Sequence, residues 1–202
     1  MEIISEALFG IANSLLIPDV ILLILFFFRA LLMIGGTYNS YMVRRKNSKI
    51  YDAKIKNLTS DRLGELRSLL PEKPNSLFTA YLTDLLTSKD KSEDYADYML
   101  TRFETDAAKD VNTSHLLTKL GPVLGLIGTL ISMSPALEGL SSGDISGMAY
   151  NMQVVFASTV VGLIISAVGL ATYQLKQRWY AKDINNLDYV SRIINQSEEN
   201  AK

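Results

Sequence analysis

Several serine and threonine residues in this sequence are placed where their hydroxyls could take part in chemistry inside an apolar environment. Five of them lie in two apolar segments: Thr129, Ser132, Ser158, Thr159 and Ser166. A hydroxyl both donates and accepts hydrogen bonds, so a helix face that carries several could line an aqueous or partner-filled lumen. A serine or threonine in a membrane helix can equally donate to a carbonyl oxygen one turn back, without further function. Residue spacing alone leaves both interpretations open.

Small residues recur at helical spacing through the same two segments. Steps of three or four residues separate Gly121, Gly125, Gly128 and Ser132 in the first, and Thr159, Gly162, Ser166 and Gly169 in the second. Such steps place each set on one face of a helix. In lipid, close approach between helices depends on small residues at the contact. The pattern therefore predicts that the glycines pack helices together, within the chain or between copies of it.

The rest of the composition argues against most other kinds of site. The chain has no cysteine and a single histidine, His115, which disfavours thiolate chemistry, a histidine-based metal site and a Ser-His-Asp triad. The formal net charge is −1, without the basic excess that is typical of nucleic-acid binding. No glycine-rich phosphate-binding motif is present. We therefore expect no enzyme activity, no metal, no cofactor and no nucleic-acid partner.

Three apolar runs are long enough to cross a bilayer, which needs about 20 helical residues. They cover residues 15–36, 116–133 and 152–173. We therefore expect an all-α integral membrane protein with three transmembrane helices, whose longer helices project into the cytoplasm. His115 begins the second run, where we expect an interfacial residue rather than one that carries protons.

The first run is interrupted by Pro18, Asp19 and Arg29. The residues before it include Glu2 and Glu6 but no lysine or arginine, the reverse of a basic signal-peptide start, so we expect the run to be retained. An arginine inside a bilayer is costly. We expect Arg29 to reach toward the interface or lipid phosphate; the alternative is that it faces a neighbouring subunit or partner.

Lysine and arginine gather on one side of the predicted spans. Residues 1–19 and 135–151 contain none, whereas they are frequent between the first two spans and after the third. The positive-inside rule then places the N-terminus outside and the C-terminus in the cytoplasm of a plasma (inner) membrane protein. The predicted regions are an outside N-terminus and first span (1–42), a cytoplasmic helical region (43–114), a transmembrane hairpin (115–175) and a cytoplasmic amphipathic tail (176–202).

The predicted cytoplasmic parts read as helices with two interruptions. PEKP at 71–74 contains two prolines and ends a helical segment, and the polar stretch TSKDKSED at 87–94 predicts a second break. A Gly/Ser-rich turn is expected at 135–150, between the second and third spans. The tail has apolar residues at helical spacing, which predicts an amphipathic helix: Leu187, Val190, Ile193 and Ile194.

Two motifs resemble a known family. GPVLGLIGTLISM at 121–133 is similar to the Gly-Pro-x-x-Gly-Leu-x-Gly-Thr pattern of the MotA/TolQ/ExbB proton channel family, and ASTVVGLIISA at 157–167 is similar to its Ala-x-Thr-x-x-Gly-Leu pattern. The three-span order resembles the shorter TolQ and ExbB branch. The sequence departs from several ExbB-like members at Gln153 and Val154, near which they carry a glutamate.

The resemblance implies a role for particular residues. Thr129 and Thr159 correspond to the two threonines that lie beside the family's ion path. The family leads us to expect a pentameric ring around a single-span partner similar to ExbD, TolR or MotB, whose aspartate carries the proton. The second and third spans contain no carboxylate, in keeping with a partner that supplies one.

The leading hypothesis is thus a ring subunit of an ion-driven stator that couples ion flow to mechanical work. One alternative is a membrane scaffold or assembly protein without ion flux, in which the small residues only pack helices. A self-contained transporter is the second alternative, disfavoured because the sequence has few spans and no inverted repeat.

Overall fold

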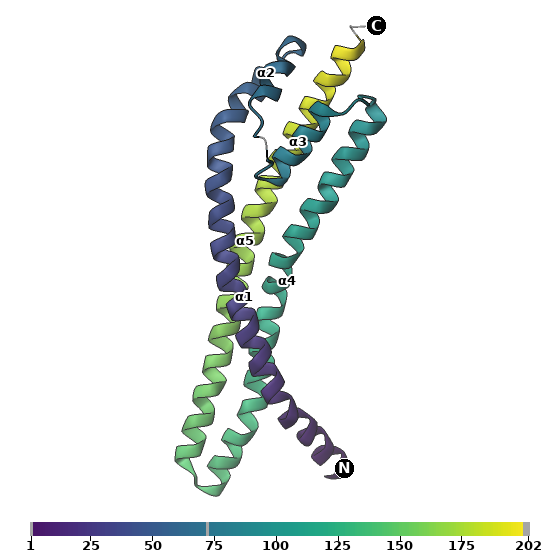
Figure 1. Cartoon of the computed structure of the whole chain (residues 1–202). Coiled ribbons are helices and arrows are strands. Elements are labelled where there is room, and N and C mark those ends of the chain that lie inside the picture. Colours follow the sequence, from purple (N-terminus) through teal and green to yellow (C-terminus); the bar gives the residue numbers. More distant parts are fainter. Residues whose placement is uncertain (1, 72, 200–202) are drawn as a thin grey trace. The chain divides into compact units, whose positions relative to one another are not determined.

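The computed structural model describes residues 2–71 and 73–199, and within them it is helical without strands. Three long helices dominate (Figure 1): α1 (Glu2–Lys56), α4 (Glu93–Ser142) and α5 (Ile145–Glu199). The short elements η1 (Ser60–Arg62), α2 (Leu63–Ser68) and α3 (Leu77–Thr87) lie between α1 and α4 in the chain. The predicted all-α class is confirmed.

Three helices are long and apolar enough to cross a membrane, as the sequence predicts. The candidate spans lie within Asn13–Lys56, Glu93–Ser142 and Ile145–Glu198. Helices of 50 to 55 residues extend roughly 80 Å, more than twice the hydrocarbon thickness of a bilayer. Each helix therefore continues well beyond its apolar part.

The chain divides into two compact units. The first unit contains the chain up to Ile34 together with Thr113–Tyr173, and the second contains Gly35–Asn112 and the chain from Gln174 onward. The first unit holds the three apolar runs except for Gly35 and Gly36, and its small core consists of Leu23, Ala30, Leu117 and Ile165. Ala30 is only 1% exposed, so its small side chain lets α1 pack closely against the other two helices.

The turn between α4 and α5 is shorter than the sequence predicts. Helix α4 continues through Pro135 to Ser142, and α5 begins at Ile145, so the turn is limited to Gly143 and Asp144. Gly143 adopts a φ of +77°, which favours glycine, and the Asp144 carboxylate accepts a hydrogen bond from the backbone of Gly147 at 2.9 Å. This cap starts α5 where composition alone indicates a loop.

The second unit has the larger core. It combines one face of α3 with the end of α1, the start of α4 and the end of α5 around the fully buried Leu82 and Leu187. Ser76 and Thr79 form a reciprocal capping box that starts α3. The predicted apolar face of the tail is confirmed, because the four residues that define it are buried: Leu187, Val190, Ile193 and Ile194.

Both predicted helix breaks are confirmed. No helix covers residues 73–76, after the first proline of PEKP, and α3 ends at Thr87 while α4 begins at Glu93. In the second break, the Ser92 hydroxyl accepts a hydrogen bond from the backbone of Tyr95 at 3.2 Å. That bond satisfies one of the free backbone donors at the start of α4.

Candidate functional site in the membrane helices

The hairpin of α4 and α5 is held at backbone contact distance by glycines. A Cβ atom placed on Gly162 would lie 2.5 Å from the carbonyl oxygen of Gly121 and 2.9 Å from the Cα atom of Gly125. A Cβ atom on Gly121 would lie 2.6 Å from the carbonyl oxygen of Gly162. Real Cβ atoms do not approach other atoms so closely, so the two helices touch through their main chains.

The same contact continues one turn on either side. A Cβ atom on Gly125 would lie 3.1 Å from the carbonyl oxygen of Ser158, and one on Gly169 would lie 2.7 Å from the backbone nitrogen of Thr118. The structure thus brings the glycines of both spans to a single seam, hereafter the glycine seam, which consists of Gly121, Gly125, Gly128, Gly162 and Gly169.

A proline in α4 explains the position of Ser166. Pro122 lacks a backbone N–H, so the carbonyl oxygen of Thr118, one turn earlier, has no donor within its helix. The Ser166 hydroxyl of α5 donates to this oxygen at 2.9 Å. In an apolar environment an unpaired carbonyl is costly, so this bond lets α4 carry a proline within its apolar part. The Ser166 hydroxyl therefore has a structural role, because its hydrogen bond joins the third span to the second.

Thr129 and Thr159 are both half-buried, and both bond to their own helices. The Thr129 hydroxyl donates to the carbonyl oxygen of Leu126 at 2.7 Å, and the Thr159 hydroxyl donates to that of Val155 at 3.4 Å. Each hydroxyl has then used its single hydrogen and keeps lone pairs that can accept a bond. The Cα atom of Thr159 also borders the glycine seam, 3.3 Å from where a Cβ atom on Gly125 would lie.

Asp19 has no part in the function that the sequence motifs predict. Its side chain is buried beside Gly128 of α4 and Ser158 of α5, and neither carboxylate oxygen has a hydrogen-bond partner among the described residues. The sequence could have indicated it, because a carboxylate inside an apolar run of a membrane helix marks a candidate functional site. Ser132, one turn after Gly128, is likewise buried without a partner for its hydroxyl among those residues.

Arg29 and His115 are not members of the glycine seam. Arg29 is exposed on α1 in the single chain. The ring of His115 stacks on that of Tyr173, with ring centroids 5.1 Å apart. The Ser114 hydroxyl of α4 donates to the sulfur of Met33 in α1 at 3.3 Å. These contacts lie near the end of the spans where α4 enters and α5 leaves the apolar region.

Most of the apolar surface of the spans is uncovered. Only 17% of the most apolar window of α1 is buried in the chain, and 28% of each corresponding window in α4 and α5. The exposed side chains include large residues such as Leu32, Leu130 and Phe156. A surface of this kind is stable only in lipid or against other chains.

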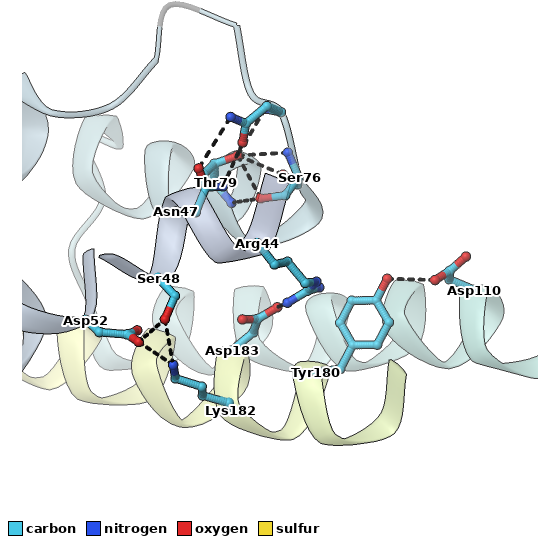
Figure 2. A network of polar contacts seen from close by, with 11 residues as sticks. Arg44, Asn47, Ser48, Asp52, Ser76, Thr79, Asp110, Tyr180, Lys182 and Asp183 are labelled. Atoms are coloured by element: carbon cyan, nitrogen blue, oxygen red, sulfur yellow. Dashed lines mark hydrogen bonds and ion pairs between the residues drawn. The ribbon is translucent and has the colours of Figure 1, made fainter. Parts of the chain in front are cut away.

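The second unit contains a polar network that links α1 to α5 (Figure 2). Arg44 donates to the carboxylate of Asp183 at 2.5 Å, and the Arg44 guanidinium lies 5.2 Å from the ring centroid of Trp179. Burial raises the pKa of Asp183, and the Arg44 charge opposes that rise. A second ion pair joins Lys182 to Asp52.

Helices α4 and α5 are joined within this unit through Asp110. Its carboxylate accepts a hydrogen bond from the Tyr180 hydroxyl at 2.7 Å and pairs with Lys176 at 2.9 Å. Burial, followed by the hydrogen bond to Asp110, raises the pKa of Tyr180. These bonds fix the registers of α1, α4 and α5 within the second unit, so their chemistry is structural.

No group of three or more His, Asp or Glu side chains is placed to hold a metal ion within residues 2–71 and 73–199. The candidate site consists of hydroxyls and one carboxylate along the glycine seam. Its groups can bind, hydrate or release a small cation, and none is placed as an activated nucleophile.

Comparison with known proteins identifies one family. The model described as "MotA/TolQ/ExbB proton channel family" matches residues 71–188, more than half of the chain. The match includes α3, all of α4 and most of α5, and so both helices of the glycine seam. Searches of curated proteins and of solved structures find no match.

Proposed function

We propose that this chain, which belongs to the MotA/TolQ/ExbB proton channel family, is the pore-forming ring subunit of an ion-driven stator. Copies of the chain, five by analogy with the family, would surround a single-span partner similar to ExbD, TolR or MotB. Proton flow past that partner would then drive movement of the partner relative to the ring. The family match over residues 71–188 is the observation that carries this proposal.

The uncovered apolar surface supports an assembly. The spans bury only 17% to 28% of their most apolar windows within the chain, so most of each window is free for lipid, for a second copy or for a partner. Within residues 2–71 and 73–199 one chain has three candidate spans, and side chains such as Leu23, Leu117 and Ile165 fill the core between them. A pore in this protein therefore calls for several chains.

The hydroxyls of Thr129 and Thr159 would face the partner's carboxylate. Both have donated their hydrogen to their own helices, so each offers lone pairs to a hydrated or protonated group. Ser132 and Ser158 would extend this polar path, whereas Ser166 would support it from the seam. The glycine seam keeps α4 and α5 a rigid pair against which a partner can move.

The charge distribution supports an orientation in the plasma (inner) membrane. The segment before the first span and the turn around Gly143 contain no lysine or arginine, so both would lie outside. The second unit, which carries Arg44, Lys176 and Lys182, would then lie in the cytoplasm. Arg29 would sit in the ring near a neighbouring subunit or reach toward lipid phosphate.

The test is ion flux through the assembled complex. The chain is co-expressed with the product of a neighbouring gene for a single-span protein with a membrane aspartate, and the complex is imaged and reconstituted into vesicles. Thr129→Val and Thr159→Val remove the hydroxyls at nearly constant volume, and we expect proton flux to fall while assembly persists. Thr105→Val is the matched control, since that hydroxyl makes the same bond one turn back in the exposed part of α4.

A scaffold without ion flux is the second candidate. It is favoured by the observation that the hydroxyls of Thr129, Ser158, Thr159 and Ser166 all have backbone partners in the single chain. Unchanged flux in both threonine variants, with no foreign helix in the centre of the assembly, would support the scaffold and contradict the stator.

A further inference from the structure

The first span contains a carboxylate that the proposed function does not use. Asp19 is 5% exposed, and both of its carboxylate oxygens are buried without a hydrogen-bond partner among the described residues. An ionised carboxylate without partners is unstable in an apolar medium, so the group needs a proton or a cation there. We propose that Asp19 is a proton-binding site of this chain itself, completed by Gly128 and Ser158.

Three helices converge on this site. A Cβ atom on Gly128 of α4 would lie 2.8 Å from Oδ2 of Asp19 and 3.1 Å from Oγ of Ser158. The carboxyl of α1 and the hydroxyl of α5 therefore flank the same point, and only glycine at position 128 leaves room for both. The two groups are not hydrogen-bonded to each other, so the proposed bond requires a rotation of the Asp19 side chain toward the Ser158 hydroxyl.

The hydrogen-bond polarity of Ser158 selects the protonated form of Asp19. The Ser158 hydroxyl already donates its hydrogen to the carbonyl oxygen of Val154 at 2.6 Å. It can therefore only accept a bond from Asp19. An ionised carboxylate accepts only, whereas a protonated one can donate. The pair is complementary when Asp19 carries a proton and mismatched when it does not.

No charged group on the packed helices compensates an ionised Asp19. The nearest charges along the chain are Arg29 on α1 and, on either side of Gly128 in α4, Lys119 and Glu138. At about 1.5 Å per residue, these lie roughly 14 Å or more along the helix axes. Helix α5 has no charged residue between its start at Ile145 and Lys176. The charge of a deprotonated Asp19 would thus be unbalanced.

The oxygen ligands favour a proton over a metal cation. Hard cations such as Ca²⁺ take six or more oxygen ligands. The oxygens that the structure brings together beside Gly128 are those of the Asp19 carboxyl and the Ser158 hydroxyl, fewer than such a cation takes. A proton needs only the carboxyl and the acceptor that Ser158 provides.

The site would give each copy of the chain its own titratable group in the membrane. Proton binding at Asp19 is a property of the single chain and does not depend on a ring or a partner. Only its use as a station on an ion path would rest on the proposed function. An experiment can therefore contradict proton binding at Asp19 without contradicting the stator proposal, and the reverse.

The test uses the full-length chain alone, in vesicles, with dicyclohexylcarbodiimide as the probe, since this apolar reagent modifies protonated carboxyls. The modified residues are located by mass spectrometry from about pH 5 to about pH 9. We expect modification at Asp19 that falls tenfold for each pH unit above its midpoint. Glu138 and Asp183 are the internal controls: the first is an exposed carboxylate on a membrane helix, and the second is buried but paired with Arg44.

Two further comparisons sharpen the result. Ser158→Ala removes the acceptor for the protonated carboxyl, so we expect the midpoint at Asp19 to move to lower pH. Ser141→Ala, which removes an exposed hydroxyl of α4, should leave it unchanged. No modification of Asp19, or modification that does not vary with pH, would overturn the proposal. Protection by sodium chloride but not by choline chloride would also overturn it, in favour of a metal cation.

Discussion

Replacing Gly162 by alanine should separate the helices of the glycine seam. The added Cβ atom would lie 2.5 Å from the carbonyl oxygen of Gly121 and 2.9 Å from the Cα atom of Gly125. Contacts between such atoms are normally about 3.5 Å or longer, so α4 and α5 must move apart by roughly 1 Å. Both close atoms belong to the backbone, so no side chain can turn away to relieve the collision.

The expected cost is about 1–3 kcal/mol of unfolding free energy, the usual range for an overpacked site. Alanine is otherwise the better helix former by about 1 kcal/mol, so the measured loss is the collision less this gain. Gly36→Ala is the matched control, because nothing lies within 4 Å of its added Cβ atom in α1. That variant should be neutral or more stable by up to about 1 kcal/mol.

The chain has no cysteine, so an introduced pair can carry two fluorophores for an energy-transfer assay. Replacing Leu116 and Leu170, both exposed, by cysteine places the dyes on α4 and α5. Unfolding is followed in mixed micelles with increasing sodium dodecyl sulfate. If Gly162→Ala matches or exceeds the unmodified Gly162 protein in stability, while Gly36→Ala behaves as expected, the backbone contact at the glycine seam is refuted.

Three further predictions concern polar groups. Ser166→Ala should lower the free energy of unfolding by about 1–3 kcal/mol, because it leaves a buried carbonyl unpaired. Adding Pro122→Ala should recover part of that loss, because alanine restores the missing backbone donor. A double-mutant cycle in the same unfolding assay measures this coupling. Burial raises the pKa of Asp183 in the folded state, so the free energy of unfolding should decline as pH rises from about 4 toward that raised pKa. Arg44→Gln removes the charge that opposes the rise, so the decline should extend to higher pH. Denaturant titrations at several pH values measure both effects. Burial, followed by a hydrogen bond to a carboxylate, raises the pKa of Tyr81 to about 12. The free energy of unfolding should therefore fall as pH rises above about 10, and this part of the pH dependence should be absent in Tyr81→Phe. Tyrosinate absorbance and thermal melts measure it.

Much of the fold follows from local pattern. The three apolar runs predict three spans because a bilayer demands about 20 apolar residues in helical form wherever they occur. The buried face of the tail follows from the spacing of Leu187, Val190 and Ile194, since residues three and four apart share one side of a helix. The absence of helix at residues 73–76 follows from proline chemistry. None of these depends on what the segments later contact.

The turn between α4 and α5 shows where local reasoning fails. The Gly/Ser-rich composition of residues 135–150 predicts a turn over that stretch, yet helix covers all of it but Gly143 and Asp144. Gly139 lies against the backbone of Met148, where a Cβ atom would be 3.1 Å from its nitrogen. The helices continue because they pack on each other, and tertiary contact outweighs weak intrinsic propensity.

The candidate site divides in the same way. The sequence by itself determined the small residues of the glycine seam and the family motif, because both are repeats of residue type along one helix. Only the tertiary structure decided that Ser166 serves the carbonyl freed by Pro122, and that Asp19 shares one point with Gly128 and Ser158. Ser166 lies 44 residues from Pro122, and Asp19 lies 109 residues from Gly128 and 139 from Ser158. A hydrogen bond or a buried charge acts over a few ångströms in space, and periodicity along one helix carries no information about which atom of another helix lies within that distance.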